Sequence, residues 1–227
     1  AKNFFENNKI KSYILPIGGN FDEYDFNQSC ECDIFVDCNL FNRRSIVDIV
    51  LRLKKETNYK IKICGKNWNK YLSKKEFELI KDSYYEFIKP ENIKEEYLSS
   101  KIIIDDCNIT TIEFGSVNKR VIDCITCKRL VLTDNLVGSE ELFENKLLTY
   151  KSYDELNGLI IKYLNNSKLY DQKANELYNL CKEFINNKNI LKFLSSLEHI
   201  ISNTNNHFSP YYTRDHASKY ILVDKNK

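Results

Sequence analysis

Methionine is absent from the 227-residue sequence, including from position 1, and the chain has only three prolines, six glycines and one tryptophan. Because a natural chain begins with methionine, we expect this sequence to be part of a longer protein. Its apolar runs stay well short of the roughly 18 residues that a membrane span needs. The start also lacks the basic and apolar regions of a secretory signal. The sequence therefore predicts neither a membrane span nor an export signal.

Neither sign of charge is in excess, since 34 basic residues face 32 acidic ones and leave a net charge of +2. Nucleic-acid-binding domains usually carry a clear basic excess, so we expect no nucleic-acid partner. A hydrophobic content of 42%, with 13% aromatic residues, is enough for a packed core and disfavours a disordered chain.

Cysteine occurs eight times, too rarely in a chain of this length for a disulfide-built scaffold. Cys124 and Cys127 have the C-x-x-C spacing of half a zinc site or of a redox pair. The sequence has no second C-x-x-C, and the spacing of Cys30 and Cys32 does not suit a structural zinc site. We favour buried packing for these thiols, predict no metal site, and expect a reducing cytoplasm as the compartment.

Apolar, β-branched segments alternate with helical patterns about every 20 residues. The expected strands span residues 33–37, 60–64, 85–88, 101–105, 130–132 and 147–150. Helices are expected over residues 46–56, 93–99 and 154–164, from Ser73 to Asp82, and from about Val117, with Ser45 and Ser73 as N-caps. This alternation predicts an α/β fold, a Rossmann-like, doubly wound and mostly parallel sheet of about six strands, with C-terminal helices.

Four regions follow from this pattern. Residues 1–30 are expected to be a lead-in from a missing N-terminal domain, and residues 31–166 to be the Rossmann-like domain. Residues 167–205 form a C-terminal helical extension, with two helices between 167 and 202. Residues 206–227 are a tail to which the pattern assigns no structure.

The stretch from Ile112 to Phe143 brings a loop, a helix and a buried strand together, followed by a second loop. Its helix carries Arg120 and Asp123 close to its start, where free N–H groups and the helix dipole attract anions. The loop before it contains Gly115, which allows a turn or a close backbone approach. In doubly wound sheets ligands bind at the carboxyl ends of the strands, so this junction is a candidate anion site.

The spacing in this stretch follows a recognisable pattern. Its members are Gly115, Asn118, Arg120, Asp123 and Cys127, then the apolar strand, then Thr133-Asp134 and Glu141-Leu142-Phe143. The pattern resembles the C-terminal, donor-binding half of GT-B glycosyltransferases, in the group 1-type branch grouped with spore-maturation glycosyltransferases. The resemblance extends from about Tyr13 to Asn165. The departures from the pattern are Ile122 for the usual phenylalanine, Asp123 for the commoner glutamate, and Lys128 for the usual glycine.

The resemblance implies transfer of a sugar from a nucleoside diphosphate donor to a hydroxyl acceptor, in bacterial cell-surface or polysaccharide glycan synthesis. It implies no cofactor besides the donor substrate and no metal, since the chain lacks the Asp-x-Asp of metal-dependent enzymes. The acceptor, whether a glycan, a lipid or a protein, would meet the missing N-terminal domain. This part of the chain alone is therefore expected to be inactive, and the resemblance also implies retention at the anomeric carbon.

Two arginines follow the first expected strand, in the segment Asn39 to Arg44. Guanidinium groups pair with phosphate oxygens, so Arg43 or Arg44 is expected to hold the donor diphosphate. The alternative is a solvated arginine pair at a helix start. After the second strand, Gly65 is expected to let the backbone approach the nucleotide. Nearby Trp68 either stacks on the base or packs in the core, and we favour packing.

Arg120 and Arg44 are the residues we expect to stabilise the departing diphosphate, and therefore to be catalytic. The resemblance implies that Asp123 holds the ribose. Asn39, Gly115, Asn118 and Glu141 complete the expected donor site. The alternative for Arg120 and Asp123 is an i, i+3 salt bridge on a helix surface.

A different class of function also fits the pattern. The weakened motif allows a non-catalytic, Rossmann-like nucleotide-binding or interaction module of a larger protein. A hydrolase is disfavoured because the three histidines, His199, His207 and His216, all lie beyond the Rossmann-like region. A nicotinamide-binding domain is disfavoured because the organising stretch has no G-x-G-x-x-G.

Overall fold

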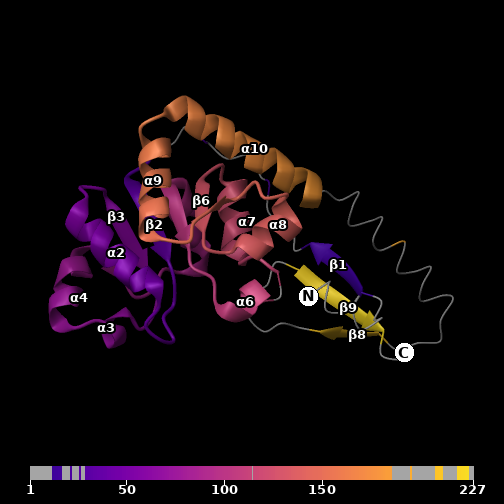
Figure 1. The fold of residues 1–227 in the computed structure, drawn as a ribbon, viewed down its shortest axis with the longest axis horizontal. Coiled ribbons are helices and arrows are strands. Elements are labelled where there is room, and N and C mark those ends of the chain that lie inside the picture. The colour runs from indigo at the N-terminus through magenta and orange to yellow at the C-terminus, as the bar shows by residue number, and fades with distance from the viewer. Residues whose placement is uncertain are drawn as a thin grey trace.

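The computed structural model describes residues 12–16, 21, 26, 29–113, 115–185, 195, 208–211 and 219–224. Its centre is a six-stranded sheet in the order β4-β3-β2-β5-β6-β7, in which every neighbouring pair is parallel (Figure 1). The strands are β2 (Cys32–Asp37), β3 (Ile61–Cys64), β4 (Tyr84–Tyr85), β5 (Ser100–Asp105), β6 (Leu130–Thr133) and β7 (Leu148–Thr149). The predicted doubly wound Rossmann-like sheet is confirmed.

Helices cover both faces of this sheet. The long ones are α2 (Ser45–Glu56), α7 (Lys119–Thr126), α8 (Leu136–Phe143), α9 (Tyr153–Leu164) and α10 (Ser167–Ile185). The short ones are α3 (Trp68–Tyr71), α4 (Lys74–Ile80), α5 (Ile93–Leu98) and α6 (Ile109–Glu113). Helix α7 contacts α5, α10, β5 and β6, whereas α2 contacts α4 and meets the start of α9 through Arg52, whose guanidinium lies over the Tyr153 ring.

The middle of each of the two central strands is apolar because helices cover the sheet on both sides. Ile34, Phe35 and Val36 of β2 are fully buried, as are residues 102–104 of β5. Their register pairs Phe35 with Ile103. The core of the domain therefore lies around the β2–β5 pair.

The direction of the chain reverses at this same pair of strands. From β2 the chain continues to β3 and β4 on one side, and from β5 it continues to β6 and β7 on the other. The loops that leave β2 and β5 therefore diverge, which opens a crevice at the carboxyl ends of these strands. This topological switch point is the place where the fold predicts a ligand.

Local signals were correct at some helix ends and wrong at others. Ser73 caps α4 in a capping box with Glu76, as expected. Ser45 is the first residue of α2 instead of its cap, and the N-cap position is taken by Arg44. The predicted loop after residue 133 contains helix α8, whose Gly138 is held close to Val117 and Asn135. Helices α3 and α6 were also missed, because they are too short for a helical period to show.

A second, three-stranded sheet joins the two ends of the chain. It has the order β1-β9-β8 and is antiparallel, with β1 at Ser12–Pro16, β8 at Phe208–Tyr211 and β9 at Lys219–Asp224 (Figure 1). The expectation of no structure over residues 206–227 was therefore wrong. The second helix expected after α10 falls mostly outside the described residues. Within the described part, none of the helices is long and apolar enough to cross a membrane.

Candidate functional site

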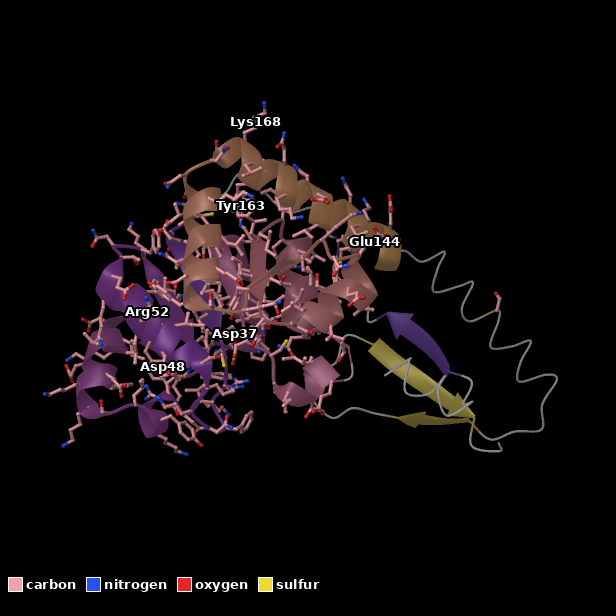
Figure 2. The ribbon with its side chains drawn as sticks, viewed as in Figure 1. Asp37, Asp48, Arg52, Glu144, Tyr163 and Lys168 are labelled. Atoms are coloured by element: carbon pink, nitrogen blue, oxygen red, sulfur yellow. The ribbon has the colours of Figure 1, made fainter. Side chains whose placement is uncertain are left out.

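Six charged side chains meet at the carboxyl ends of the central strands. We call them the rim cluster, and its members are Asp37, Arg44, Asp105, Asp106, Arg120 and Asp134. Asp37 ends β2 and Asp105 ends β5, and Figure 2 places Asp37 between the α2 side and the α7 side of the sheet. Arg44 enters from the start of α2 and Arg120 from the first turn of α7.

Asp105 is the centre of the cluster and is completely buried. Its Oδ1 accepts a hydrogen bond from Asn118 Nδ2 at 2.8 Å, and its Oδ2 accepts one from Thr133 Oγ1 at 2.8 Å and one from Cys107 Sγ at 3.3 Å. Arg120 Nε lies 3.5 Å from Asp105 Oδ1. These donors come from three different segments, so the carboxylate ties α7, β6 and the β5 loop together.

Arg120 lies among carboxylates, and one of its buried donor nitrogens has no hydrogen-bond partner. Burial lowers its pKa, but Asp37 and Asp105 outweigh that effect and raise the pKa above its ordinary value. Its Nη1 is buried without a hydrogen-bond partner. A buried guanidinium nitrogen without an acceptor is costly, and an anion at this place would satisfy it.

Arg44 approaches the cluster from the other side of the sheet. Its Nη2 lies 2.8 Å from Asp106 Oδ2 and donates to Cys38 Sγ at 2.8 Å and to the Asn39 carbonyl at 3.1 Å. Its Nε is buried without a partner, as is Nη1 of Arg120. The two predicted catalytic arginines therefore occupy one cluster, and each carries an unused buried N–H.

Carboxyl groups outnumber guanidiniums in the rim cluster by four to two. Burial raises the pKa of Asp106, although Arg44 opposes this. Burial also raises the pKa of Asp134 to about 7, helped by the charges of Asp106 and Asp105, although Asp134 accepts a hydrogen bond from the Cys107 amide at 2.9 Å. The cluster is therefore acidic, and Asp134 titrates near neutral pH.

Arg43 points away from the cluster although it is next to Arg44 in the sequence. It pairs with Asp48 at 2.5 Å and Glu76 at 3.0 Å and donates to the Tyr71 carbonyl at 2.9 Å. Of the two arginines, Arg44 is therefore the one that lies in the rim cluster. Arg43 matches the alternative of a solvated arginine at a helix start.

The loop after β3, which contains Gly65 and Trp68, packs against the loop after β2. A Cβ at Gly65 would lie 1.9 Å from the Cys38 carbonyl oxygen, and the residue has φ of 143°. Asn39 Oδ1 accepts from the Lys66 amide at 2.8 Å. Trp68 is fully buried and donates from Nε1 to the Cys38 carbonyl at 2.8 Å. Trp68 therefore packs, and Gly65 is needed for contact between two backbones.

The remaining predicted residues lie close to the cluster but do different things. Gly115 has φ of 57° and lies at the turn before α7. Asn118 is the N-cap residue of α7, but its side chain donates a hydrogen bond to Asp105 and does not cap the helix. Asp123 pairs with Lys119 at 2.5 Å on the surface of α7, so it forms an i, i+4 bridge and not the i, i+3 bridge with Arg120. The side chain of Glu141, on α8, lies outside the described residues.

The carboxylates of the cluster were not selected from the sequence. Asp37 and Asp105 each end a strand with an apolar middle. Asp106 follows Asp105 directly, and Asp134 directly follows the end of β6. An acidic residue at the end of a buried strand was the available signal, since it costs free energy there unless it is paired or functional. Two strands with this feature at the switch point would have indicated the cluster.

A groove lies at the opposite edge of the sheet. It has a volume of about 710 Å³ and opens beside the amino ends of β2 and β3, where Lys54, Lys60, Lys62 and Glu96 line it. Lys62 is already paired with Glu96 at 2.5 Å. Ligands of parallel sheets bind at the opposite ends of the strands, so we place the candidate site at the rim cluster.

A model of the family described as "Glycosyl transferase-like" matches residues 43–195, which is more than half of the chain. The chain belongs to this glycosyltransferase family. The match begins at Arg43 and includes Arg44, the carboxylates that follow β5 and β6, and Arg120. No match was found among curated protein sequences.

Solved glycosyltransferase structures share the fold of this glycosyltransferase-family chain. Sucrose-phosphate synthase from Thermosynechococcus elongatus matches with a TM-score of 0.58 at 12% identity, over 84% of this chain and 53% of its own. A glycosyltransferase from Rickettsia africae matches with 0.59 at 16% identity, over 83% and 57%. TarM from S. aureus matches with 0.54 at 14% identity, over 78% and 37%. The chain thus has a GT-B type Rossmann-like fold and spans about half the length or less of these structures. The assignment to the spore-maturation branch stays a prediction.

Proposed function

We propose that this domain is the donor-binding half of a GT-B glycosyltransferase, and that Arg44 and Arg120 hold the diphosphate of a nucleoside diphosphate sugar. The observation that supports this is the convergence of two guanidiniums at the switch point of the sheet, each with a buried N–H that lacks an acceptor. Phosphate oxygens are the acceptors that such groups bind best. TarM, whose fold is similar, was solved with UDP bound, which supports a diphosphate ligand.

The chemistry follows from the charges. When the bond between sugar and diphosphate breaks, negative charge builds up on the leaving oxygen, and fixed cations in a partly buried site stabilise it. In this proposal the cations are arginine side chains, so no metal is needed. Asp123, one turn further along α7, would accept hydrogen bonds from the ribose hydroxyls once its ion pair with Lys119 is broken. A hydroxyl of a glycan, lipid or protein acceptor would attack the anomeric carbon as the diphosphate leaves.

The wider setting is part of the same proposal. We place the enzyme in the bacterial cytoplasm, in cell-surface or polysaccharide glycan synthesis, without a nucleic-acid partner. All eight cysteines are free thiols, which fits a reducing compartment.

Calorimetric titration with UDP and with inorganic pyrophosphate tests the site. Arg44→Gln and Arg120→Gln each remove a charge-assisted contact, so each is expected to weaken pyrophosphate binding by roughly 10- to 100-fold. Arg43→Gln is the matched control, because it removes an equal charge from the neighbouring position, and it should change the affinity less than about twofold. Equal losses in all three variants would show that the overall charge, and not this site, binds the ligand.

Asp123→Asn tests the ribose contact separately. UDP binding should weaken, whereas pyrophosphate binding should stay the same because pyrophosphate has no ribose. If UDP and pyrophosphate respond alike to this change, Asp123 does not contact the ribose.

A second function has one observation in its favour. The rim cluster holds more carboxyl groups than guanidiniums, which opposes an anionic donor and suits a non-catalytic interaction module. Turnover assays on the natural protein separate the two possibilities. Transfer or hydrolysis of a nucleotide sugar supports the enzyme, and binding without turnover supports the module.

A further inference from the structure

Arg44 is already fully occupied at the nitrogen that faces the cluster. Its Nη2 donates to Cys38 Sγ at 2.8 Å and to the Asn39 carbonyl at 3.1 Å, which uses both of its hydrogens, and it forms an ion pair with Asp106 Oδ2 at 2.8 Å. The carbonyl and the thiol belong to the β2 loop, which Gly65 and Trp68 fix in place. A diphosphate that approaches the free Nε of Arg44 would therefore compete with Asp106 for the charge of the guanidinium. Asp106 is the anion that a diphosphate would displace.

The loss of Arg44 would be costly for Asp106, because Asp106 is buried beside other carboxyl groups. It is 5% exposed, and Asp105 precedes it with a second, fully buried carboxyl group. The ionisable groups that face it come from every element around it: Cys38 after β2, Arg44 before α2, Asp105 on β5, Arg120 on α7, Asp134 after β6 and Tyr150 after β7. In this group the cations are the two arginines, and Arg120 already lies between Asp37 and Asp105.

The loss of Arg44 would leave Asp106 as a buried carboxylate beside other carboxylates. A carboxyl group in that position binds a proton, because burial disfavours its charged form and the remaining cation, Arg120, also lies beside Asp37 and Asp105. The proton comes from the solvent buffer, and the carboxylate becomes a neutral carboxylic acid.

We propose that Asp106 competes with the donor diphosphate for Arg44, and that diphosphate binding is accompanied by uptake of a proton on Asp106. The inference rests on the proposed donor site and adds a residue that sets its affinity. The site then binds diphosphate more weakly than its arginines alone would allow, and it binds more tightly as the solution becomes more acidic.

The first measurement compares Asp106→Asn with the parent chain in calorimetric titrations with UDP and inorganic pyrophosphate. The asparagine keeps the shape of the side chain and removes its charge. Both ligands are expected to bind about tenfold more tightly, a size typical of coupling between two competing equilibria. Asp48→Asn is the matched control, because Asp48 is paired with Arg43 on the surface and its loss should leave both affinities unchanged.

The second measurement needs only the parent chain. Pyrophosphate is titrated at pH 7 in Hepes and in Tris, two buffers with different ionisation enthalpies. Proton uptake makes the observed enthalpy depend on the buffer, with up to one proton taken up per ligand bound. In Asp106→Asn this dependence should disappear.

Each outcome has one meaning. If the parent binds both ligands and Asp106→Asn binds them equally or less tightly, the competition is wrong, although the donor site stands. If the enthalpy in the parent does not depend on buffer, or if Asp106→Asn still takes up a proton, the proton does not go to Asp106. If neither chain binds UDP or pyrophosphate at millimolar concentration, the proposed function itself fails.

Discussion

The rim cluster and the outer surface of helices α2 and α4 contain the same chemical groups in two different surroundings. On the surface, Arg43 joins Asp48 and Glu76, and the Arg43 and Asp48 side chains are 40% and 64% exposed. In the rim cluster, the Asp106 and Asp105 side chains that face Arg44 and Arg120 are 3% and 0% exposed. Arg43 and Arg44 are consecutive in the sequence, so the two environments are reached by neighbouring residues.

The consequences for ionisation are opposite. On the surface, hydrogen bonds from Arg43 and from the Ser73 backbone lower the pKa of Glu76 to about 2. At the rim, burial raises the pKa of Asp106 in spite of Arg44, and it raises the pKa of Asp134 in spite of the hydrogen bond from the Cys107 amide. A surface ion pair is solvated and changes little when it is removed. A buried one cannot lose a partner without leaving a charge that water does not reach.

The largest expected effect comes from removing one guanidinium from each environment. Arg120→Leu leaves Asp105 and Asp37 without their cation, and should lower the free energy of unfolding by about 3 kcal/mol. Arg43→Leu should lower it by less than about 1 kcal/mol, because its ion pairs are exposed and screened by solvent. Urea denaturation at pH 7.5 measures both. Equal losses would remove the distinction between the two regions.

The next effect compares a glycine at the rim with one on the helical surface. Gly65→Ala places a Cβ against the Cys38 carbonyl in a backbone conformation that alanine rarely adopts, and should cost about 2–3 kcal/mol. Gly158→Ala, on α9 where a new Cβ would meet nothing within 4 Å, should instead stabilise the fold by about 0.5–1 kcal/mol. Thermal unfolding of the two variants checks the signs, and a harmless Gly65→Ala would contradict the close loop contact.

A smaller effect depends on pH. The pKa of Asp134 is raised in the folded state, so its ionisation opposes folding: stability is complete below about pH 4 and decreases as the pH rises through about 7. Asp134→Asn keeps an acceptor for the Cys107 amide and removes the charge. After allowance for partial exposure, the variant should be more stable than the parent by about 1–2 kcal/mol at pH 8 and equal to it at pH 4.

Denaturation curves of the parent and Asp134→Asn at these two pH values are sufficient. A difference that does not change with pH would mean that the substitution acts through packing and not through ionisation.

The smallest expected effect is none. Because arginine supplies the cations of the proposed site, treatment with EDTA should leave UDP binding unchanged in calorimetry. A large loss of affinity on chelation, restored by Mg²⁺ or Mn²⁺, would place a metal ion in the site and contradict the arginine-based proposal.

The sheet could be predicted from sequence because each of its central strands has a local apolar pattern. A run such as residues 101–105 has three successive isoleucines, and similar runs recur at a regular distance along the chain. The strands near the end of the chain, β8 and β9, were missed for the opposite reason, since β9 pairs with β1 at the other end of the sequence. No local pattern contains that information.

The site could be predicted only in part. Arg44, Asn118 and Arg120 were chosen correctly as residues that meet at one edge, because the motif and the strand ends placed them there. Their partners could not be chosen, because the pairing of Arg44 with Asp106 depends on strand order and on the direction of two side chains. Asp123 and Arg43 illustrate the same limit. Arg43 precedes Arg44 and Asp123 lies one helical turn after Arg120, but each of them pairs on the surface.

The single tryptophan provides an internal optical probe of the rim. Trp68 is the only indole in the sequence, and its N–H is bonded to the carbonyl of Cys38, whose sulfur contacts Arg44. Fluorescence emission therefore comes from one position directly behind the β2 loop, without labelling. A ligand that draws Arg44 away from Cys38 should shift the emission, whereas urea should move it to the red as the indole becomes hydrated. Stopped-flow fluorescence could then time the motion of this loop separately from any chemical step.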